Sequence, residues 1–471
     1  MMKIQTCVSA MGLVFVITAC SSVPVQQPDI HYAEHYLVGI VQSGSDKNVD
    51  VKSVDVNWWQ AFQSPVLNEL MLAAQTQSPD LLMSAERVKQ AELQMQIANA
   101  SLFPSLSANA SIGESRSKPD GANTTRSEST RVGASINYEV DLWGGIAAGR
   151  AAARAGYDAT QFNQDAARLS IKAAIANGWF QWLALQERIA TAQKNIAIAE
   201  RVQNIVDARY QNGVATAADV AQQKTNLLNQ QASLFPLQLQ ARQTQSALAI
   251  LVGKTPQEFS LVVEQLLALQ VPQVSAGVPA DVITRRPDLA ASEADLRAAS
   301  ANIQAARAAL LPGISLGANA GKSASELLSM NPVTQTSGWT LSLAQSLFNG
   351  GRLINQKKLS EARRSELLLQ YHKSILMALQ EVDNALVAAD VSQRQEVSQQ
   401  NIVANAERSL RLTEARYRAG SEDLLSLLDA QRSFFQAQDT LVQQRLSRLN
   451  AAVDLYKSLG GGWQFAQQSN Q

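Results

Sequence analysis

Histidine and cysteine, the commonest ligands of transition metals, are scarce in this chain of 471 residues, which holds three histidines and two cysteines. His31 and His35 have the i,i+4 spacing of two ligands on one helix face, but no third ligand lies near them in the sequence. A metal site there competes with a plainer interpretation, two solvated histidines in a linker. No GxSxG, HExxH, P-loop or dinucleotide fingerprint stands out. We therefore expect no enzyme, no cofactor and no metal centre.

Cys20 is the residue whose surroundings indicate a covalent modification. The segment 1–19 contains one cation, an apolar run and then small residues, which is the pattern of a secretory signal peptide. Its ending, ITAC, resembles a bacterial lipobox, in which the cysteine thiol is acylated and becomes the first residue after cleavage. We expect Cys20 to be lipidated and to anchor the chain to the outer membrane. The alternative is an ordinary signal peptide with an incidental cysteine.

Composition excludes two broad classes of protein. With 40 basic and 40 acidic side chains, the chain lacks the positive charge expected of a nucleic-acid binder. A hydrophobic content of 46% with 17% charged residues argues against a disordered chain. The 24 glycines and 13 prolines are few for a fold built of turns and short strands, so long helices should dominate.

An internal duplication organises the chain. Pro79-Asp80-Leu81 recurs 208 residues later as Pro287-Asp288-Leu289. The motif ARYxxG, which ends at Gly213, recurs 207 residues later and ends at Gly420. A unit of about 200 residues exceeds the 20–50 residues of a solenoid repeat. We therefore expect two copies of a domain-sized unit.

Each repeat carries a pair of strands. The segment Val132 to Val140 alternates strictly between apolar and polar residues, and comparable alternation occurs near 106–112, 314–320 and 339–343. Strands of about ten residues suffice to cross a bilayer at a tilt. A four-stranded sheet in lipid would leave its edge groups without partners, so other subunits must complete it. Three copies would give twelve strands, enough for a barrel with an aqueous lumen.

Two long segments, from about 147 to 210 and from about 353 to 417, contain no proline and should each form one helix. At 1.5 Å per residue such a helix spans about 100 Å. The second segment carries a sevenfold apolar stripe that Glu396 interrupts. Its members are Leu368, Ile375, Val382, Ala389, Val403, Leu410 and Tyr417. Such stripes indicate coiled-coil packing.

Taken in order, these features resemble the TolC-like outer membrane factors, in particular the lipoprotein branch that serves tripartite drug efflux pumps. The resemblance includes the opening pattern WW..F..P.L..L from Trp58 to Leu70 and the ending LYKSLGGGW. It implies a mostly α-helical chain with a coiled-coil tunnel in the periplasm and four transmembrane strands, closed as a twelve-stranded barrel in a homotrimer. It also implies a channel without enzymatic activity that docks to a periplasmic adaptor protein and, through it, to an inner-membrane transporter.

The resemblance and the duplication together predict the domain boundaries. We expect a signal peptide at 1–19, a lipidated tether and equatorial segment at 20–60, the first repeat at 61–254, an equatorial linker at 255–280, the second repeat at 281–460 and a tail at 461–471. The competing function is a periplasmic coiled-coil scaffold lipoprotein without a pore.

The resemblance also implies where the channel closes. The turns between paired helices should fall at Gly213 and Gly420, and the segment after the second turn lines the periplasmic constriction. Spacing places Leu425 and Asp429 there, as an apolar plug and an acidic ring around a threefold axis. The plainer alternative pairs Asp429 with Arg432 on a solvated helix face.

Related channels hold their closed state by tying an aspartate of the first tip to a tyrosine and a basic residue of the second. Asp219 and Tyr417 match the first two positions. Arg418 is the expected cation, because Glu422 stands where one family member carries arginine. This departure from the family pattern makes the details of the lock specific to this chain.

Overall fold

The computed structural model describes residues 55–118, 120–121, 123–272, 284–326, 328 and 330–464. Cys20, His31 and His35 lie outside the described residues, as do the predicted signal peptide and parts of the predicted linker and tail. The described residues form two compact units. One unit comprises 88–160 and 291–372, and the other comprises 55–87, 161–272, 284–290 and 373–464, wherever these ranges are described. Each unit takes residues from both predicted repeats.

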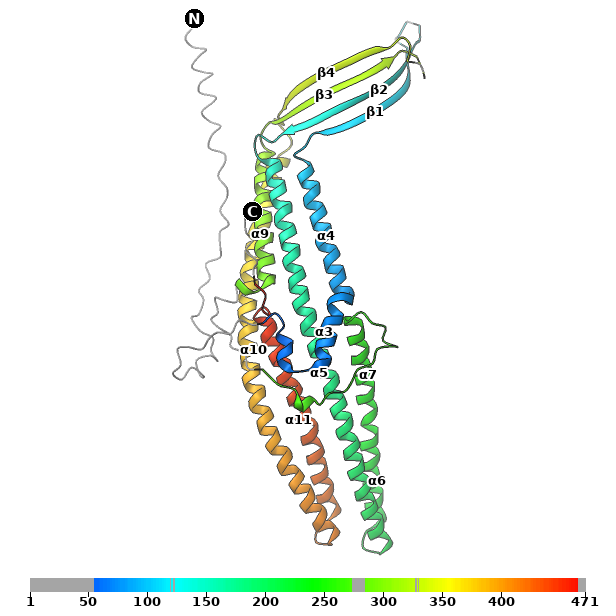
Figure 1. Cartoon of the computed structure of the whole chain (residues 1–471), viewed down its shortest axis with the longest axis vertical. Coiled ribbons are helices and arrows are strands. Elements are labelled where there is room, and N and C mark those ends of the chain that lie inside the picture. Colours follow the sequence, from blue (N-terminus) through cyan, green and yellow to red (C-terminus); the bar gives the residue numbers. More distant parts are fainter. Residues whose placement is uncertain are drawn as a thin grey trace, which may run out of the picture. The chain divides into compact units, whose positions relative to one another are not determined.

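The first unit contains one antiparallel sheet of four strands in the order β1-β2-β3-β4 (Figure 1). The strands are β1 (Ser105–Ser117), β2 (Thr125–Val140), β3 (Gly313–Ala324) and β4 (Thr334–Ala344). The predicted strand pairs are confirmed. Pairing of β2 with β3 joins the two repeats into one sheet.

The register keeps apolar and polar side chains on opposite faces of this sheet. One row of partners runs Leu106, Ile136, Ala318 and Trp339, and further rows on the same face contain Leu316 with Leu341 and Ile314 with Leu343. The neighbouring row on the other face runs Ser105, Asn137, Gly317 and Thr340. Because side chains alternate with a period of two, a slip of one residue would exchange the faces. In the single chain the apolar face is exposed, with 76% of Trp339 accessible.

Long helices make up most of the remaining described structure. The two longest, α5 (Gly145–Gln211) and α10 (Arg352–Arg418), contain 67 residues each and confirm the predicted helices. The return helix of the second repeat is continuous as α11 (Leu424–Ser458), whereas that of the first repeat is divided into α6 (Ala217–Ala232) and α7 (Leu234–Leu251). The other elements are η2 (Trp58–Phe62), α3 (Pro65–Gln77), α4 (Pro79–Ala100), η3 (Leu266–Ala268) and α9 (Pro287–Ala308).

The predicted apolar stripe of α10 faces inward. Ile375, Val382, Leu410 and Tyr417 are at most 4% exposed. Sevenfold repetition keeps one side of the helix toward its partner, as in coiled coils. Among the described helices, none has both the length and the apolar composition that a membrane crossing requires.

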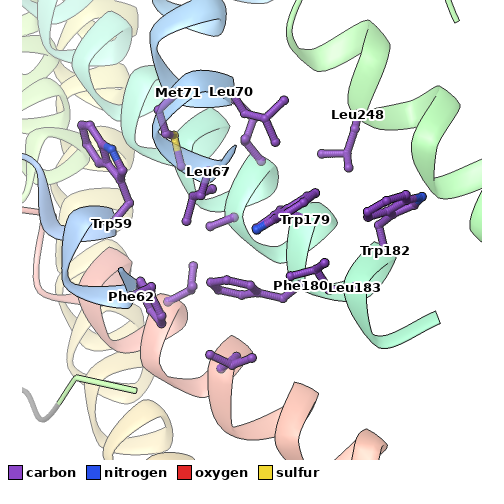
Figure 2. Packing of buried hydrophobic residues seen from close by; sticks show 14 of the residues in the cluster. Trp59, Phe62, Leu67, Leu70, Met71, Trp179, Phe180, Trp182, Leu183 and Leu248 are labelled. Carbon is purple, nitrogen blue, oxygen red and sulfur yellow. The ribbon is translucent and has the colours of Figure 1, made fainter. Parts of the chain in front are cut away.

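Aromatic and aliphatic side chains pack together in the core of the second unit (Figure 2). Trp58 stacks on Tyr456 with ring centroids 5.2 Å apart, and Phe62 lies 5.0 Å from Phe180. The opening segment of the family pattern is therefore buried against α5 and α11. Full burial of such side chains contributes about 1.5–3 kcal/mol each.

Ser64 connects this core to the segment between the repeats. Its hydroxyl caps α3 by accepting from the Leu67 N–H at 3.1 Å, and it accepts from Nε1 of Trp179 at 3.1 Å. The same hydroxyl donates to the Glu264 carboxylate at 2.5 Å. Glu264 also accepts from the Val66 N–H at 3.1 Å. One buried side chain therefore links α3, α5 and the inter-repeat segment.

We expect Ser64→Ala to lower the unfolding free energy by about 1–3 kcal/mol, because it removes a helix cap and leaves buried polar groups without a partner. Thermal denaturation followed by circular dichroism measures the change. Ser365→Ala is the matched control, since this exposed hydroxyl donates only to its own helix, at the Glu361 carbonyl. Equal denaturation midpoints for the two variants would contradict the role given to Ser64.

Candidate functional site

The two helix turns predicted from the repeated ARYxxG motif have the same geometry. Gly213 and Gly420 have φ values of +74° and +81°, which glycine adopts without strain. The N–H of Val214 donates to the Arg209 carbonyl at 2.8 Å, and the N–H of Ser421 donates to the Arg416 carbonyl at 2.9 Å. Both turns thus end their helices in the Schellman pattern.

The start of α11 presents two different faces. Asp423 caps the helix by accepting from the Ser426 N–H at 2.7 Å, and this bond holds the pKa of its carboxyl below the usual range. Leu424, Leu427 and Leu428 pack into an apolar cluster with α5 and α10. Leu425 and Asp429 lie one turn apart on the exposed face, where 66% of Leu425 is accessible.

In the single chain, Asp429 forms an ion pair with Arg432. This is the contact that the plainer interpretation predicts. Both side chains are more than half exposed, so the pair contributes at most about 1 kcal/mol. The threefold ring stays a prediction, because it requires other copies of the chain.

Tyr417 is buried where α10 approaches α5. The guanidinium carbon of Arg209 lies 4.5 Å from the centroid of its ring, and Arg209 also donates to the Tyr417 carbonyl. Burial raises the pKa of the Tyr417 phenol; Arg209 opposes this shift, and the charge of Asp219 adds to it. The phenol therefore stays neutral at physiological pH and interacts with Arg209 through its ring.

Asp219 forms the start of α6. Its carboxylate accepts from the N–H of Thr216 at 2.8 Å and from the Thr216 hydroxyl at 2.9 Å. The Thr216 hydroxyl in turn accepts from the Asp219 N–H at 3.1 Å, which completes a capping box. Asp219 thus holds the first helix turn in shape while its charge acts on Tyr417.

The cation that contacts Tyr417 is Arg209 of the first repeat, whereas Arg418 pairs elsewhere. Arg418 donates to Glu414 at 2.9 Å, and the same carboxylate accepts two hydrogen bonds from Arg201, each 3.1 Å long. The repeated ARY motif contained the signal for Arg209, since its counterpart is Arg416. Sequence alone does not show which of the two arginines reaches across to the other repeat.

Further contacts join the same pair of helical hairpins. Arg188 of α5 makes two hydrogen bonds to Asp439 of α11, at 2.6 and 3.2 Å. Asn226 of α6 donates to Gln431 of α11 at 3.1 Å. Together with the contacts of Arg201 and Arg209, these bonds connect the first repeat to the second at four levels. Most are partly exposed, so each contributes little to stability.

A groove of about 820 Å³ lies beside these contacts, between the ends of α5 and α10. Arg201, Arg209 and Arg418 line it together with Glu200 and two asparagines, Asn204 and Asn212. The groove carries three cations and one carboxylate, and Arg201 and Arg418 share Glu414 as their partner, so one net positive charge remains to favour acidic groups of a partner.

Comparisons with known proteins identify relatives along most of the chain. The family model described as "Outer membrane efflux protein" matches residues 70–254 and 278–461. The pyoverdine export outer membrane protein OpmQ of Pseudomonas putida is 40% identical over 87% of this chain and 89% of its own length. The probable efflux pump outer membrane protein TtgC of Pseudomonas putida is 32% identical over 97% of this chain and 96% of its own length.

Solved structures of outer membrane proteins have a similar fold. The open state of the Neisseria gonorrhoeae MtrE outer membrane channel superposes with a TM-score of 0.81 at 27% identity, covering 94% of this chain and 98% of that chain. A membrane protein from Pseudomonas aeruginosa gives a TM-score of 0.82 at 28% identity, covering 93% of this chain and 99% of that chain.

A double-mutant cycle tests the contact between Arg209 and Tyr417. We expect Arg209→Ala and Tyr417→Leu to be coupled by about 0.5–2 kcal/mol, because each removes the same cation–π contact. Thermal denaturation of the two single variants and the double variant measures this coupling. Arg418→Ala with Tyr417→Leu is the control pair and should be additive. If the losses in unfolding free energy for Arg209→Ala and Tyr417→Leu simply added, the cation–π contact would contribute nothing to stability, against this expectation.

Proposed function

Because this chain belongs to the outer membrane efflux protein family and is the outer membrane channel of a tripartite efflux system, we propose that three copies of it form one continuous duct. In this proposal a periplasmic adaptor protein and an inner-membrane transporter deliver drugs or other small molecules to the duct, which releases them outside the cell. The duct itself performs no catalysis.

The observation that carries this proposal is the four-stranded sheet. Among the described residues, β1 and β4 each pair with one strand and so form the two edges. An unpaired strand edge in lipid costs several kcal/mol per backbone group. Pairing β4 of one copy with β1 of the next removes all edges when three copies close a ring. Twelve strands lie within the range known for outer membrane barrels.

The two faces of the sheet set its orientation in that ring. The face that carries Ile136, Leu316 and Trp339 suits lipid, and the face that carries Ser105, Asn137 and Thr340 suits a water-filled lumen. A scaffold protein without a pore would leave the apolar face in water. The exposure of Trp339, Leu341 and Leu343, each above 60%, favours the pore.

We expect Ile136→Arg to destabilise the assembled channel by about 2–4 kcal/mol, because it would place a charge in the hydrocarbon layer. The matched variant, Asn137→Arg, changes the next residue of the same strand but points into the lumen, and its effect should be much smaller. The temperature at which oligomers dissociate on gels measures both. Similar losses at the two positions would refute the assignment of faces.

Lipid anchoring through Cys20 is part of the proposal and rests on the lipobox resemblance. We expect mass spectrometry of the mature protein to find an acylated N-terminal peptide that begins at Cys20. Several acyl chains would be needed for firm anchoring, since one chain binds a bilayer only marginally. An unmodified cysteine, or cleavage at another site, would end this part of the proposal.

We propose that the exposed face of α11 forms the constriction that closes the duct. Three Leu425 side chains would narrow the duct and three Asp429 carboxylates would concentrate cations beside them. Support comes from the exposure of both side chains one turn apart, on the face opposite the buried leucines. Arg209 contacts Tyr417 between the two hairpins, and Glu414, which pairs with Arg418, also binds Arg201 of the first hairpin. These contacts support a closed arrangement in which the charge of Asp219 acts on Tyr417.

We expect Asp429→Asn to weaken cation selectivity, because it removes the negative potential of the ring. Arg432→Gln should act in the opposite direction, since it frees the Asp429 carboxylate from its ion pair. Leu425→Ala should raise conductance for ions of both signs. Planar-bilayer recordings on purified oligomers measure all three, and unchanged selectivity and conductance throughout would place the constriction elsewhere.

The groove at the ends of α5 and α10 is the surface that we propose for docking. The positive groove beside Arg201, Arg209 and Arg418 is proposed to receive the adaptor, through acidic groups that match its charge. Relatives that align over most of this chain are named for different cargoes, pyoverdine in one case and toluene in another. We therefore propose that the transporter selects the cargo and that the duct only conducts it.

A further inference from the structure

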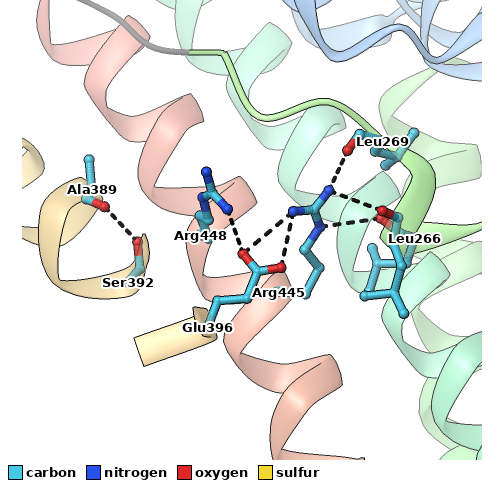
Figure 3. Close-up of polar contacts among 8 residues, drawn as sticks. Leu266, Leu269, Ala389, Ser392, Glu396, Arg445 and Arg448 are labelled. Carbon is cyan, nitrogen blue, oxygen red and sulfur yellow. Dashed lines mark hydrogen bonds and ion pairs between the residues drawn. The ribbon is translucent and has the colours of Figure 1, made fainter. Parts of the chain in front are cut away.

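Glu396 interrupts the apolar stripe of α10, and neither the pore nor the gate uses it. Its side chain is only 2% exposed. The carboxylate accepts hydrogen bonds from Arg445 at 3.1 Å and from Arg448 at 2.8 Å, both on α11 (Figure 3). We call these three residues the ion cluster.

Arg445 extends the ion cluster to a third segment. It is 7% exposed, and it donates to the carbonyls of Leu266 at 3.5 Å and Leu267 at 3.3 Å and to that of Leu269. These carbonyls belong to the segment between the two repeats. One guanidinium therefore holds α10, α11 and the inter-repeat segment together.

The first repeat carries two apolar residues and one exposed glutamine at the corresponding positions. With the offset of 207 residues, Ile189, Gln238 and Ala241 correspond to Glu396, Arg445 and Arg448. Ala241 packs with Leu185 and Leu237 in a buried cluster, and Ile189 lies against it. Replacing buried ion pairs by apolar residues is often neutral or stabilising. Stability alone therefore does not explain the ion cluster.

What distinguishes the ion cluster is that it resists sliding. Apolar contacts along the stripe have no preferred direction, so a small shift of one helix weakens them gradually. The ion cluster loses several directed hydrogen bonds with the same shift and would leave charges buried without partners. It is thus a fixed point in a hairpin whose other contacts are largely apolar, one exception being the hydrogen bond from Gln399 to the Ala437 carbonyl at 2.9 Å.

We propose that the ion cluster is the hinge of the gate, which confines opening movements of the second hairpin to residues 397–444, between the cluster and the turn at Gly420. The proposal rests on the proposed function, in which this turn lies at the periplasmic gate. On the other side of the cluster, α10 and α11 stay fixed to the inter-repeat segment. Glu396, Arg445 and Arg448 act by fixing the positions of α10, α11 and the inter-repeat segment relative to one another.

The test compares amide hydrogen exchange in native oligomers and in the triple variant Glu396→Ile/Arg445→Gln/Arg448→Ala, which introduces the first repeat's own residues. In the native protein, we expect peptides within 397–444 to exchange faster than peptides within 373–395 and 446–458. In the variant, the slower peptides should exchange about tenfold faster, because movement now passes the hinge. Peptides around Leu185 and Leu237 serve as the internal control and should not change.

Two results would overturn the hinge. One is unchanged exchange within 373–395 and 446–458 in the variant. The other is faster exchange on both sides of the cluster together with lower heat resistance of the oligomers, which would mark a purely structural role. If the triple variant does not assemble, Arg448→Ala alone keeps the pair of Glu396 and Arg445 and should give a shift of about threefold in the same peptides.

The hinge and the gate can fail separately. If the boundary between fast-exchanging and slow-exchanging peptides moves in the triple variant, the hinge is supported, even if Asp429→Asn and Leu425→Ala leave conductance unchanged. A boundary that stays in place rejects the hinge even if both gate variants behave as expected.

Discussion

Every backbone N–H and C=O group that enters a bilayer needs a hydrogen-bond partner, and this requirement organises the rest of the molecule. The sheet satisfies it internally between β1 and β4 and leaves two edges, which other copies of the chain pair in the proposed duct. The duplication of the chain serves the same end, because each repeat contributes two strands and the pairing of β2 with β3 joins them. Exposed leucines and Trp339 on one face, with serines and asparagines on the other, complete a surface suited to lipid outside and water inside.

A duct that must open requires helices that are held together yet can move. Apolar side chains supply much of the attraction between α10 and α11, and their contacts are not directional. Arg201 and Arg209 of α5 add partly exposed contacts near the turns, to Glu414 and Tyr417. The buried ion cluster around Glu396 is the strongly directed contact in the same hairpin. In the proposed hinge, weak contacts close to the turns and a directed contact far from them together localise the opening movement.

Much of this fold could be predicted from the sequence because it depends on periodicity. Alternation in β2 and the sevenfold spacing from Leu368 to Tyr417 are properties of the residues themselves, and both long helices appear where the spacing places them. Contacts between the repeats could not be predicted in the same way. Arg209 and Arg416 occupy the same place in the repeated motif, and only tertiary packing brings Arg209 to Tyr417. Likewise Glu396 is visible in the sequence as an interruption of the stripe, whereas its arginine partners are 49 and 52 residues away.

Closure of the sheet by three copies is the central claim, and the mass of the assembly tests it most directly. Native mass spectrometry of the full mature chain, extracted from the outer membrane in mild detergent, should give a species of three times the chain mass. Its dissociation should require conditions that also disrupt the strands. A monomer that stays folded in the same detergent, with the edges of β1 and β4 unpaired, would contradict the account.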